Sequence, residues 1–532
     1  MGYKDLRSYL TALEKAGLLV RVDRPVNKDT ELMPLVRWQY RGLPEEERKA
    51  FLFTNVTDSS GRKYESPVVV AALGASRRVY ATAMGCPENE TRASWLKLTA
   101  QRTPPVMVPK TKAPVKEVIL QGADLQGPGG GLSRLPIPIS TPGFDPAPFI
   151  TAGHWVTKDP HTGIRNVGHY RAQIKAPNRT GIQLIPTQHV GIHFFESQKL
   201  GKPLEAAIVI GAQPAVAMTA VAKLPYGVDE FEVAGSLAGE PVELVKCETV
   251  DLEVPASAEI VIEGIIRTDE WEPEAPFGEY TGYLGERRYH PIFEVQCITH
   301  RRQPIFQAFI SQFPPSESSM VRGLANEAVY YDLLVNHANL PSVTDVSFPQ
   351  EAAAQHMIVI QMKKNNQAEP WRAMHAVNAV DPTYGKIAVV VDPDVDPRDL
   401  SSILWAIYTR SQPHRDWRII TGKASMLDPS AAPPNAPPEQ LWFPGVEGAG
   451  GVMIDATRKW DYPPISLPKR EYMEKARAMW EELGLPRLRP RVPWYGYLVG
   501  EWPQEWLDDA DAAVRGDYYA VGEKMTKGRK PF

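Results

Sequence analysis

The sequence predicts a mixed α/β protein built from several domains, and three observations carry this prediction. Runs with the alternation or apolar continuity of β-strands are concentrated between residues 149 and 311. Residues 316–338 have the pattern of a long helix, and residues 385–410 combine a buried strand, an acidic turn and a helix as a βα unit does. The 532 residues, 43% of them hydrophobic, suffice for several domains of roughly 100–200 residues each.

Composition and charge argue against several classes of partner. The net charge is −4, which gives no reason to expect a nucleic acid or an acidic membrane as partner. No apolar run approaches the roughly 18 residues of a membrane helix. The three cysteines, Cys86, Cys247 and Cys297, form no CxxC pair, and the N-terminal MGYKDLRSYL is too charged for a signal peptide. We therefore expect a cytoplasmic protein without disulfides or a thiolate zinc site.

The N-terminal part is expected to begin with a helix and continue with strands. A helix is predicted over residues 5–17, because Asp5 is a suitable N-cap, leucines recur on one face and Gly17 ends the pattern. The segments LLVRV at 18–22 and SPVVVAAL at 66–73 have the composition of strands.

The middle of the chain is expected to be a long connection followed by a sheet. Residues 103–148 are rich in proline and glycine, which predicts an ordered connection. Within it Gly129–Gly131 is not a phosphate loop, because no Gly-Lys-Ser/Thr follows. Further on, AAIVIGA, AEIVIEGII and IFEVQCITH are strand sequences, and the last alternates apolar and polar residues as a half-buried strand does.

The C-terminal part contains an acidic turn that resembles a calcium loop only superficially. Three aspartates stand in DPDVD at 392–396, but Pro397 occupies the place of the glycine that an EF-hand loop needs. We expect a turn in which Asp399 caps the following helix. The stretch 428–445 is proline-rich and loop-like. From residue 468 one helix is predicted, followed by aromatic segments that pack on the protein itself or on a neighbouring subunit.

The stretch EPEAPFGEYTGY at residues 272–283 is a candidate for acid–base chemistry. Pro276 and Gly278 predict a rigid turn that holds Glu274 and Glu279 beside an aromatic wall. A carboxyl group in an apolar pocket has a raised pKa and can donate a proton near neutral pH, and two neighbouring carboxyls separate into one charged and one protonated group. A surface turn with solvated glutamates is the alternative.

Other polar residues are weak signals when taken singly. Arg171 in NVGHYR can bind a carboxylate through two parallel hydrogen bonds. His189 and His193 in TQHVGIH have the i, i+4 spacing of zinc ligands, but the glutamate of HExxH is missing and the residues between them look non-helical. A zinc protease is therefore not expected. Glu230 is by itself an ordinary acidic residue.

Taken in order, these residues resemble the UbiD family of reversible decarboxylases. The likeness runs over roughly residues 1 to 465, and the tail after 465 is longer than the family's smaller members suggest. It is carried by several independent motifs: Asn166 to Arg171, Gln188-His189, Glu230, ELVKCETVDLEVPASAEIVIEG at 243–264, Glu274 with Glu279, DPDVDPRDLSSILWAIYTR, and GVMIDATRKW at 451–460.

The resemblance implies prenylated flavin mononucleotide (prenylated FMN) as cofactor, supplied by a separate flavin prenyltransferase. It also implies a divalent metal, usually Mn²⁺ with Fe²⁺ or Mg²⁺ as alternatives, and K⁺. The residues that match the family's metal positions are Asn166, His189 and Glu230, whose amide, imidazole and carboxylate groups suit a hard or borderline ion. The implied cofactor site comprises these three residues together with Val167, Gly168, His169, Tyr170, Arg171, Gln188 and, for the phosphate, Lys386.

The resemblance further implies a catalytic network of Arg171, Glu274 and Glu279. In the implied mechanism the acid forms a covalent adduct with prenylated FMN and loses carbon dioxide. Arg171 orients and polarises, Glu279 delivers the proton to the vacated carbon, and Glu274 holds Arg171 and tunes Glu279.

The implied fold is a combination of α+β and α/β parts, and the implied assembly is a dimer or a hexamer. The parts are an N-terminal α/β lobe at 1–115, a prenylated-FMN-binding split β-barrel like that of flavin reductases at 116–315, a linking helix at 316–340, a C-terminal α/β oligomerisation domain at 341–465 and an extension at 466–532.

Three functions remain open from the sequence. The first is reversible non-oxidative decarboxylation of an aromatic or unsaturated acid, with the aryl-CoA thioester phthaloyl-CoA as the narrowest expectation and the arginine pairs at 287–288 and 301–302 as candidates for a CoA channel. The second is a metal-dependent hydrolase using His189, His193 and a glutamate. The third is a non-catalytic subunit of a carboxylase complex.

Overall fold

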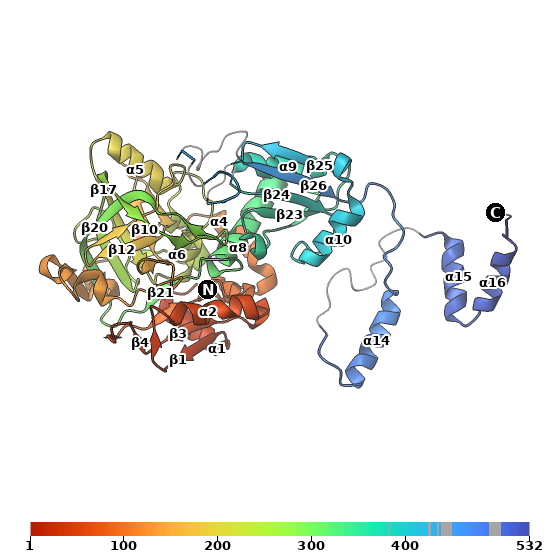
Figure 1. Ribbon diagram of the computed structural model, residues 1–532, viewed down its shortest axis with the longest axis horizontal. Coiled ribbons are helices and arrows are strands. Elements are labelled where there is room, and N and C mark those ends of the chain that lie inside the picture. The colour runs from red at the N-terminus through yellow and green to blue at the C-terminus, as the bar shows by residue number, and fades with distance from the viewer. Residues whose placement is uncertain are drawn as a thin grey trace.

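The chain folds into an N-terminal lobe, a central antiparallel sheet and a C-terminal α/β unit, followed by a tail of separate helices (Figure 1). The predicted mixed α/β class is confirmed. The computed structural model describes residues 2–530 except 382, 424–426, 434–435, 438–448 and 489–501.

The N-terminal lobe begins with the expected helix. In α1 (Leu6–Lys15) the side chain of the N-cap Asp5 accepts the Ser8 amide at 2.8 Å, and Gly17 follows the helix with a φ of +70°. The lobe also contains α2 (Leu32–Gly42), α3 (Arg77–Met84) and α4 (Thr91–Thr99). Its four-stranded sheet has the order β1 (Leu19–Val22), β3 (Ala50–Phe53), β6 (Val68–Val70) and β21 (Phe306–Ala308).

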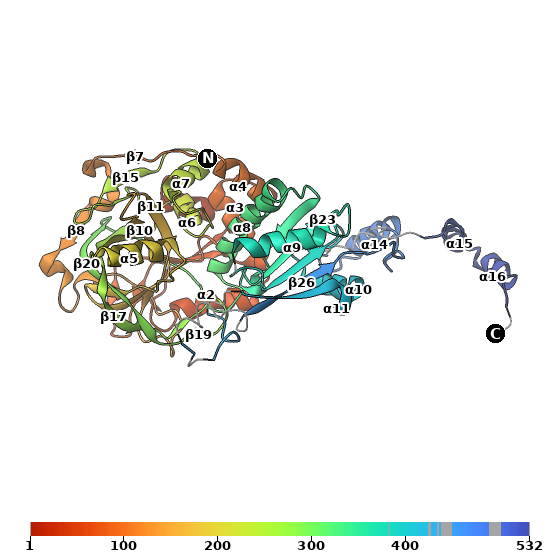
Figure 2. The ribbon, with the colours of Figure 1, turned by 90° about the horizontal axis from the view of Figure 1, so that it is seen from above.

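The central sheet is antiparallel and curls into a half-barrel (Figures 1 and 2). Within the described residues its end strands β11 and β9 do not pair with each other, so closure into a split barrel stays a prediction. The strands, in spatial order, are β11 (Arg165–His169), β10 (His154–Lys158), β14 (Leu204–Ile210), β17 (Ile260–Glu274), β20 (Arg288–His300), β13 (Arg179–Gly181), β12 (Ala172–Ala176) and β9 (Phe149–Ile150), with β8 (Val118–Gln121) on the side of β20.

Two local expectations for this region need correction. His189 to Ile192 are helical, since α5 (His189–Lys199) starts at His189. Gly191 does not break the helix but lets it approach the preceding segment, because a Cβ there would lie 2.1 Å from the carbonyl oxygen of Ile185. The connection at 103–148 is also not all loop: it contains β7 (Val106–Met107), β8 and several 3₁₀ turns. Sheet pairing across long sequence separations decides these strands, and local composition does not show it.

The helix expected at 316–338 links the two halves of the molecule. It is observed as α8 (Glu317–Asp332), continued by a π-helical turn at Leu333–His337. Its first residue, Glu317, accepts the amides of Ala71 and Leu73 at 2.9 and 3.0 Å, which ties the helix to the N-terminal lobe. Its other end packs into the core of the C-terminal unit.

The C-terminal unit is a five-stranded sheet covered on both faces. The sheet has the order β22 (Val343–Ser347), β23 (Met357–Met362), β24 (Ile387–Val391), β26 (Gly450–Ala456) and β25 (Trp417–Thr421). Because alternate residues of β23 and β24 point to opposite faces, one set packs with α9 (Glu369–Val380) and the other with α10 (Leu400–Arg410). The short α11 (Pro413–Asp416) precedes β25.

The predicted βα unit at 385–410 is confirmed. Asp399 caps α10 by accepting the Ser401 amide at 3.3 Å. Asp392 and Asp394 bind the buried Arg410 at 2.7 and 2.6 Å, so this acidic turn neutralises an arginine of the following helix.

The tail contains more helix than the sequence analysis expected. α14 (Arg470–Glu482), α15 (Gln504–Val514) and α16 (Tyr518–Thr526) bury no residue, and α15 and α16 stand apart from the body in both ribbon views (Figures 1 and 2). The prediction for the aromatic stretch between α14 and α15 falls mostly outside the described residues. Among the described residues, no helix is long and apolar enough to span a membrane.

Candidate functional site

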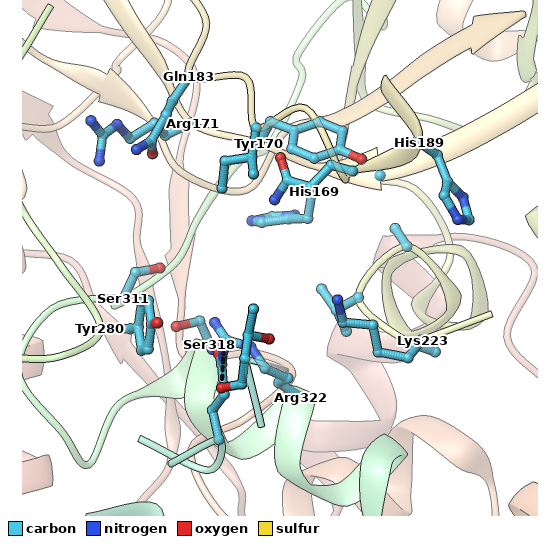
Figure 3. Close-up of a pocket in the computed structure, with 18 of the residues that line it drawn as sticks. His169, Tyr170, Arg171, Gln183, His189, Lys223, Tyr280, Ser311, Ser318 and Arg322 are labelled. Atoms are coloured by element: carbon cyan, nitrogen blue, oxygen red, sulfur yellow. Dashed lines mark hydrogen bonds between the residues drawn. The ribbon is translucent and has the colours of Figure 1, made fainter. Parts of the chain in front are cut away.

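The central sheet, α8 and the C-terminal unit together enclose a cavity of about 310 Å³ (Figure 3). The sheet contributes the end of β11 and the residues that follow it, among them Tyr170 and Arg171. Ser318 and Arg322 come from α8, and Tyr384 comes from the C-terminal unit. The site therefore exists only when the two halves of the molecule are folded against each other.

Arg171, Glu274 and Glu279 meet at one end of this cavity. Arg171 Nε donates to Glu274 Oε1 at 2.9 Å, and the adjacent nitrogen Nη1 donates to Glu279 Oε1. All three side chains are buried or nearly so, since their exposed fractions are 9%, 0% and 9%. The predicted turn thus holds both glutamates against one guanidinium and does not lie in solvent.

The backbone around Glu274 explains how the turn reaches the arginine. β17 continues to Glu274, and the chain then turns through Ala275, which has a φ of +80° and whose amide donates to Gln173 Oε1 at 2.9 Å. Phe277 follows in β18 (Phe277–Gly278), and its ring lies 5.0 Å from the guanidinium carbon of Arg171. A flat apolar face thus covers the arginine and limits water access to the network.

One oxygen of this network has no hydrogen-bond partner among the described residues. This is Glu274 Oε2, which is buried, and His290 Nε2 lies 3.9 Å away from it. Burial lowers the pKa of His290 to about 4, so this imidazole is neutral at physiological pH. Arg171 is therefore the cation that forms a hydrogen bond with Glu274. The charge of the buried Glu274 carboxylate is balanced through this one contact.

A second cavity, of about 150 Å³, adjoins the first at the network. Arg171, Gln183 and Glu279 line both cavities. The walls of the second one come from the residues around β19 (Leu284–Gly285), from Arg288 and His290 of β20, and from the segment 427–432 of the C-terminal unit. A molecule bound in one cavity can therefore meet a molecule bound in the other at Glu279.

The three predicted metal ligands also lie together. His189 Nδ1 is 3.2 Å from Asn166 Oδ1 and 4.0 Å from Glu230 Oε1. In a six-coordinate ion with bonds of about 2.1 Å, adjacent ligands are about 3 Å apart and opposite ligands about 4 Å, so both separations lie within the range that a small divalent cation spans. The donor set and the spacing therefore fit the implied metal.

The protonation state of Glu230 is also consistent with a bound cation. Glu230 opens α7 (Glu230–Ala238), is buried, and accepts the Val167 amide at 2.7 Å. Burial raises the pKa of Glu230 to about 8, and a cation at its free oxygen would restore the charged form. Within the described residues, no three His, Cys, Asp or Glu side chains are placed to hold a metal ion. Asn166, His189 and Glu230 make up three ligands only when the amide of Asn166 is counted. Metal binding at these residues stays a prediction.

The remaining predicted cofactor residues divide into two groups. Val167, Gly168, His169, Tyr170 and Gln188 all line the first cavity, as the three metal candidates and Arg171 do. Lys386 does not line it: its Nζ donates to Asp428 Oδ2 at 2.7 Å and to Ser430 Oγ at 3.1 Å.

Sequence reasoning missed two cations of the cavity, Lys223 and Arg322 (Figure 3). Lys223 forms an ion pair with Asp381 at 3.1 Å, and the opposed effects of burial and of Tyr384 and Asp381 leave its pKa raised. The two come from separate segments, and no local motif marks either one. Only the folded arrangement shows them together.

The hydrolase alternative needs His193, which lies beside His189 at a small separate cavity of about 10 Å³. His193 Nδ1 contacts Thr157 Oγ1 at 2.9 Å, and burial lowers the pKa of His193 to about 4. Its hydrogen bond is to a strand of the sheet, and it does not line the first cavity.

The chain matches known protein families over most of its length. The family models of 3-octaprenyl-4-hydroxybenzoate carboxy-lyase match it in three consecutive parts. The N-terminal domain matches residues 10–98, the Rift-related domain 106–314 and the C-terminal domain 319–456.

Relatives and solved structures give the same result. An uncharacterized protein of Archaeoglobus fulgidus is 32% identical over 511 residues, which are 91% of this chain and 99% of the relative. An evolved dimeric form of the UbiD-class enzyme HmfF from Pelotomaculum thermopropionicum, in complex with prFMN, is 33% identical with a TM-score of 0.76, covering 90% of this chain and 100% of that chain. Vanillic acid decarboxylase from Sedimentibacter hydroxybenzoicus, in closed form, is 26% identical with a TM-score of 0.75, covering 90% and 100%. The chain belongs to the UbiD family of carboxy-lyases.

Proposed function

We propose that the protein catalyses reversible, non-oxidative decarboxylation of an aromatic or unsaturated carboxylic acid with prenylated FMN as cofactor. The observation that carries this proposal is the buried network of Arg171 with Glu274 and Glu279 at the junction of two cavities. One cavity is large enough for a cofactor and the other for a small substrate, and the network lies between them.

The larger cavity suits a flavin nucleotide. When bound, prenylated FMN supplies an electrophilic carbon and a conjugated ring system that accepts the electrons released with carbon dioxide. The cavity is lined by the stretch from Asn166 to Arg171, and Lys223 and Arg322 are the cations placed to meet a phosphate. The solved relative HmfF in complex with prFMN supports this cofactor.

The residues of the network have separable tasks. Arg171 orients and polarises the reacting carboxylate, because its guanidinium is fixed by two glutamates and covered by Phe277. Glu274, fully buried, keeps that guanidinium in place. Glu279 lines both cavities and delivers the proton to the carbon that loses carbon dioxide, so the substrate carboxylate and one proton become carbon dioxide and a product with a new C–H bond at that carbon.

The size of the second cavity favours a small substrate. A dry cavity of 150 Å³ is known to admit one benzene ring, so an acid with a single ring fits the observed volume of about 150 Å³. A CoA thioester would have to keep its nucleotide outside. Arg301 is not free for such a channel, since it bonds to the carbonyl of Ser257 at 2.7 Å and lies 3.3 Å from Asp5.

We propose that Asn166, His189 and Glu230 bind a divalent ion, Mn²⁺, Fe²⁺ or Mg²⁺. For K⁺ beside the phosphate we assign no ligands. Glu230→Ala is expected to weaken Mn²⁺ binding at least 100-fold, because it removes the only carboxylate of the trio. Metal content and Mn²⁺ titration measure this. Glu232→Ala on the same helix is the matched control. Equal Mn²⁺ affinity in the Glu230 variant and the control would refute the assignment.

The decisive experiment is anaerobic purification of the protein from a host that co-expresses a flavin prenyltransferase. The expected result is stoichiometric prenylated FMN, identified by its mass and absorbance, and carbon dioxide release from a member of a panel of single-ring aromatic acids, cinnamic-type acids and phthaloyl-CoA. Protein that binds no flavin under these conditions would contradict the proposed function. Light scattering of the same preparation tests the expected homo-oligomer, for which the dimeric HmfF is a precedent.

A further inference from the structure

Two histidines of the central sheet face each other beside the cofactor cavity. His154 in β10 and His169 in β11 are cross-strand partners, and their Nδ1 atoms are 3.3 Å apart. His169 lies on the cavity wall next to Tyr170, with Arg322 on the opposite side (Figure 3). His154 is completely buried behind it. The mechanism proposed above uses neither ring.

The hydrogen bonds determine the tautomer of each ring. His169 Nε2 lies 2.5 Å from the carbonyl oxygen of Thr151, and a carbonyl only accepts, so this nitrogen carries a hydrogen. In a neutral ring the Nδ1 of His169 is then an acceptor, and the Nδ1 of His154 must be the donor. That leaves Nε2 of His154 without a hydrogen, which agrees with the finding that this buried nitrogen has no partner in the described part of the chain.

The same bonds make protonation of the pair costly. A proton added to His169 would reverse the central hydrogen bond and force a hydrogen onto Nε2 of His154, where no described residue supplies an acceptor. Burial lowers the pKa of His169 to about 4, against the opposing effect of its bond to Thr151, and the positive charge of Arg322 lowers it further. Burial and the neighbouring His169 lower the pKa of His154 as well.

His169 therefore offers no nitrogen to the cavity. One nitrogen is bonded to Thr151 and the other to His154, so only ring carbon and the π-face are left to meet a ligand. Phe309 supports the ring in a stacked arrangement, with a centroid distance of 4.9 Å and an interplanar angle of 21°. This is the construction of a rigid aromatic wall.

We propose that His154 and His169 act as a proton-locked pair whose task is to position a planar ring in the cavity, with His169 as the stacking surface and His154 as its support. The proposal rests on the proposed function for the identity of that ring, the flavin. It assigns His169 no part in proton transfer and no bond to metal or phosphate.

The first test needs no cofactor. The ¹⁵N chemical shifts of histidine-labelled apoprotein, assigned with His154→Gln and His169→Phe, report the tautomers. The expected result is a neutral ring protonated at Nε2 for His169 and at Nδ1 for His154, without titration between pH 5 and 8. Reversed tautomers, or titration of either ring in that range, would overturn the locked pair whatever the enzyme's reaction is.

The second test uses FMN binding, measured by quenching of flavin fluorescence. His169→Ala is expected to weaken binding about 10-fold, while His169→Phe, which keeps an aromatic face, stays within about 3-fold of wild type. The exposed His161, changed to alanine, is the control, and melting curves confirm folding. Equal loss in the Phe and Ala variants would show that a nitrogen matters and would refute the stacking role. Wild-type protein that binds no FMN would refute that role together with the proposed cofactor, while leaving the tautomer result intact.

Discussion

Glu279→Gln is expected to lower kcat for decarboxylation by about 10²–10⁴-fold, which is the contribution of a positioned general acid. Glutamine keeps the shape and the contact with Arg171 but carries no transferable proton. Among the described residues, Glu279 is the one carboxyl that lines both cavities. No other described carboxyl is therefore placed at their junction to substitute for it. The measurement is carbon dioxide release from whichever acid the wild-type holoenzyme accepts.

The turn itself supplies a matched control for this variant. Glu272 precedes the network by two residues, but it lies 3.3 Å from Lys175 and 3.4 Å from Arg179 and lines neither cavity. Glu272→Gln should leave kcat within about 2-fold of wild type, because a partly exposed ion pair contributes little. Prenylated FMN content must be equal in both variants. If Glu279→Gln turns over as fast as the control, Glu279 is not the proton donor.

Glu327→Gln is expected to lower the free energy of unfolding by about 3 kcal/mol, a large effect for a position outside the site. Glu327 in α8 is buried and bonds to Arg77 of the N-terminal lobe and Arg398 of the C-terminal unit, each at 2.7 Å. Burial raises the pKa of Glu327, but the two arginines outweigh this and bring the pKa down to about 2. The single carboxylate thus ties three parts of the chain together.

The sign of the pH dependence follows from that pKa. The folded value of about 2 lies below the unfolded value of 4.5, so the stabilisation is complete above pH 4.5 and is lost as the pH falls toward 2. Urea unfolding at pH 6 and pH 8 should therefore show the same deficit for Glu327→Gln. The exposed Glu351, changed to glutamine, is the control. A deficit no larger than that of the control would contradict the bridging role.

The elements that the sequence predicted well are those with a strong local pattern. α1, α8 and the βα unit each have a helix cap and periodic apolar residues within one segment. The N-cap hydrogen bonds of their helices are present in the folded protein. The expectation that the residues between His189 and His193 are non-helical was wrong, since α5 starts at His189 and its Gly191 allows close packing against the preceding segment. β8 was missed because its partner β20 lies far along the chain.

The site was predicted residue by residue through resemblance more than through local chemistry. Singly, Arg171 or Glu230 is an ordinary charged residue, and only their order along the chain pointed to a family. Nine of the ten expected cofactor residues line one cavity, and Lys386 is the exception. Its interaction with Asp428 could not be foreseen, because the two lie in separate loops of the C-terminal unit.

The sequence by itself determined the class of the fold, the family and the identity of the catalytic candidates, because these depend on residue types and their order. The tertiary structure decided what is buried and what meets across the cavity: Lys223 and Arg322 facing one ligand space, the second cavity at Glu279, and the His154–His169 pair. These features arise from contacts between distant segments. Burial and neighbouring charge, which set the pKa values of Glu230 and the histidines, exist only after those segments have packed together.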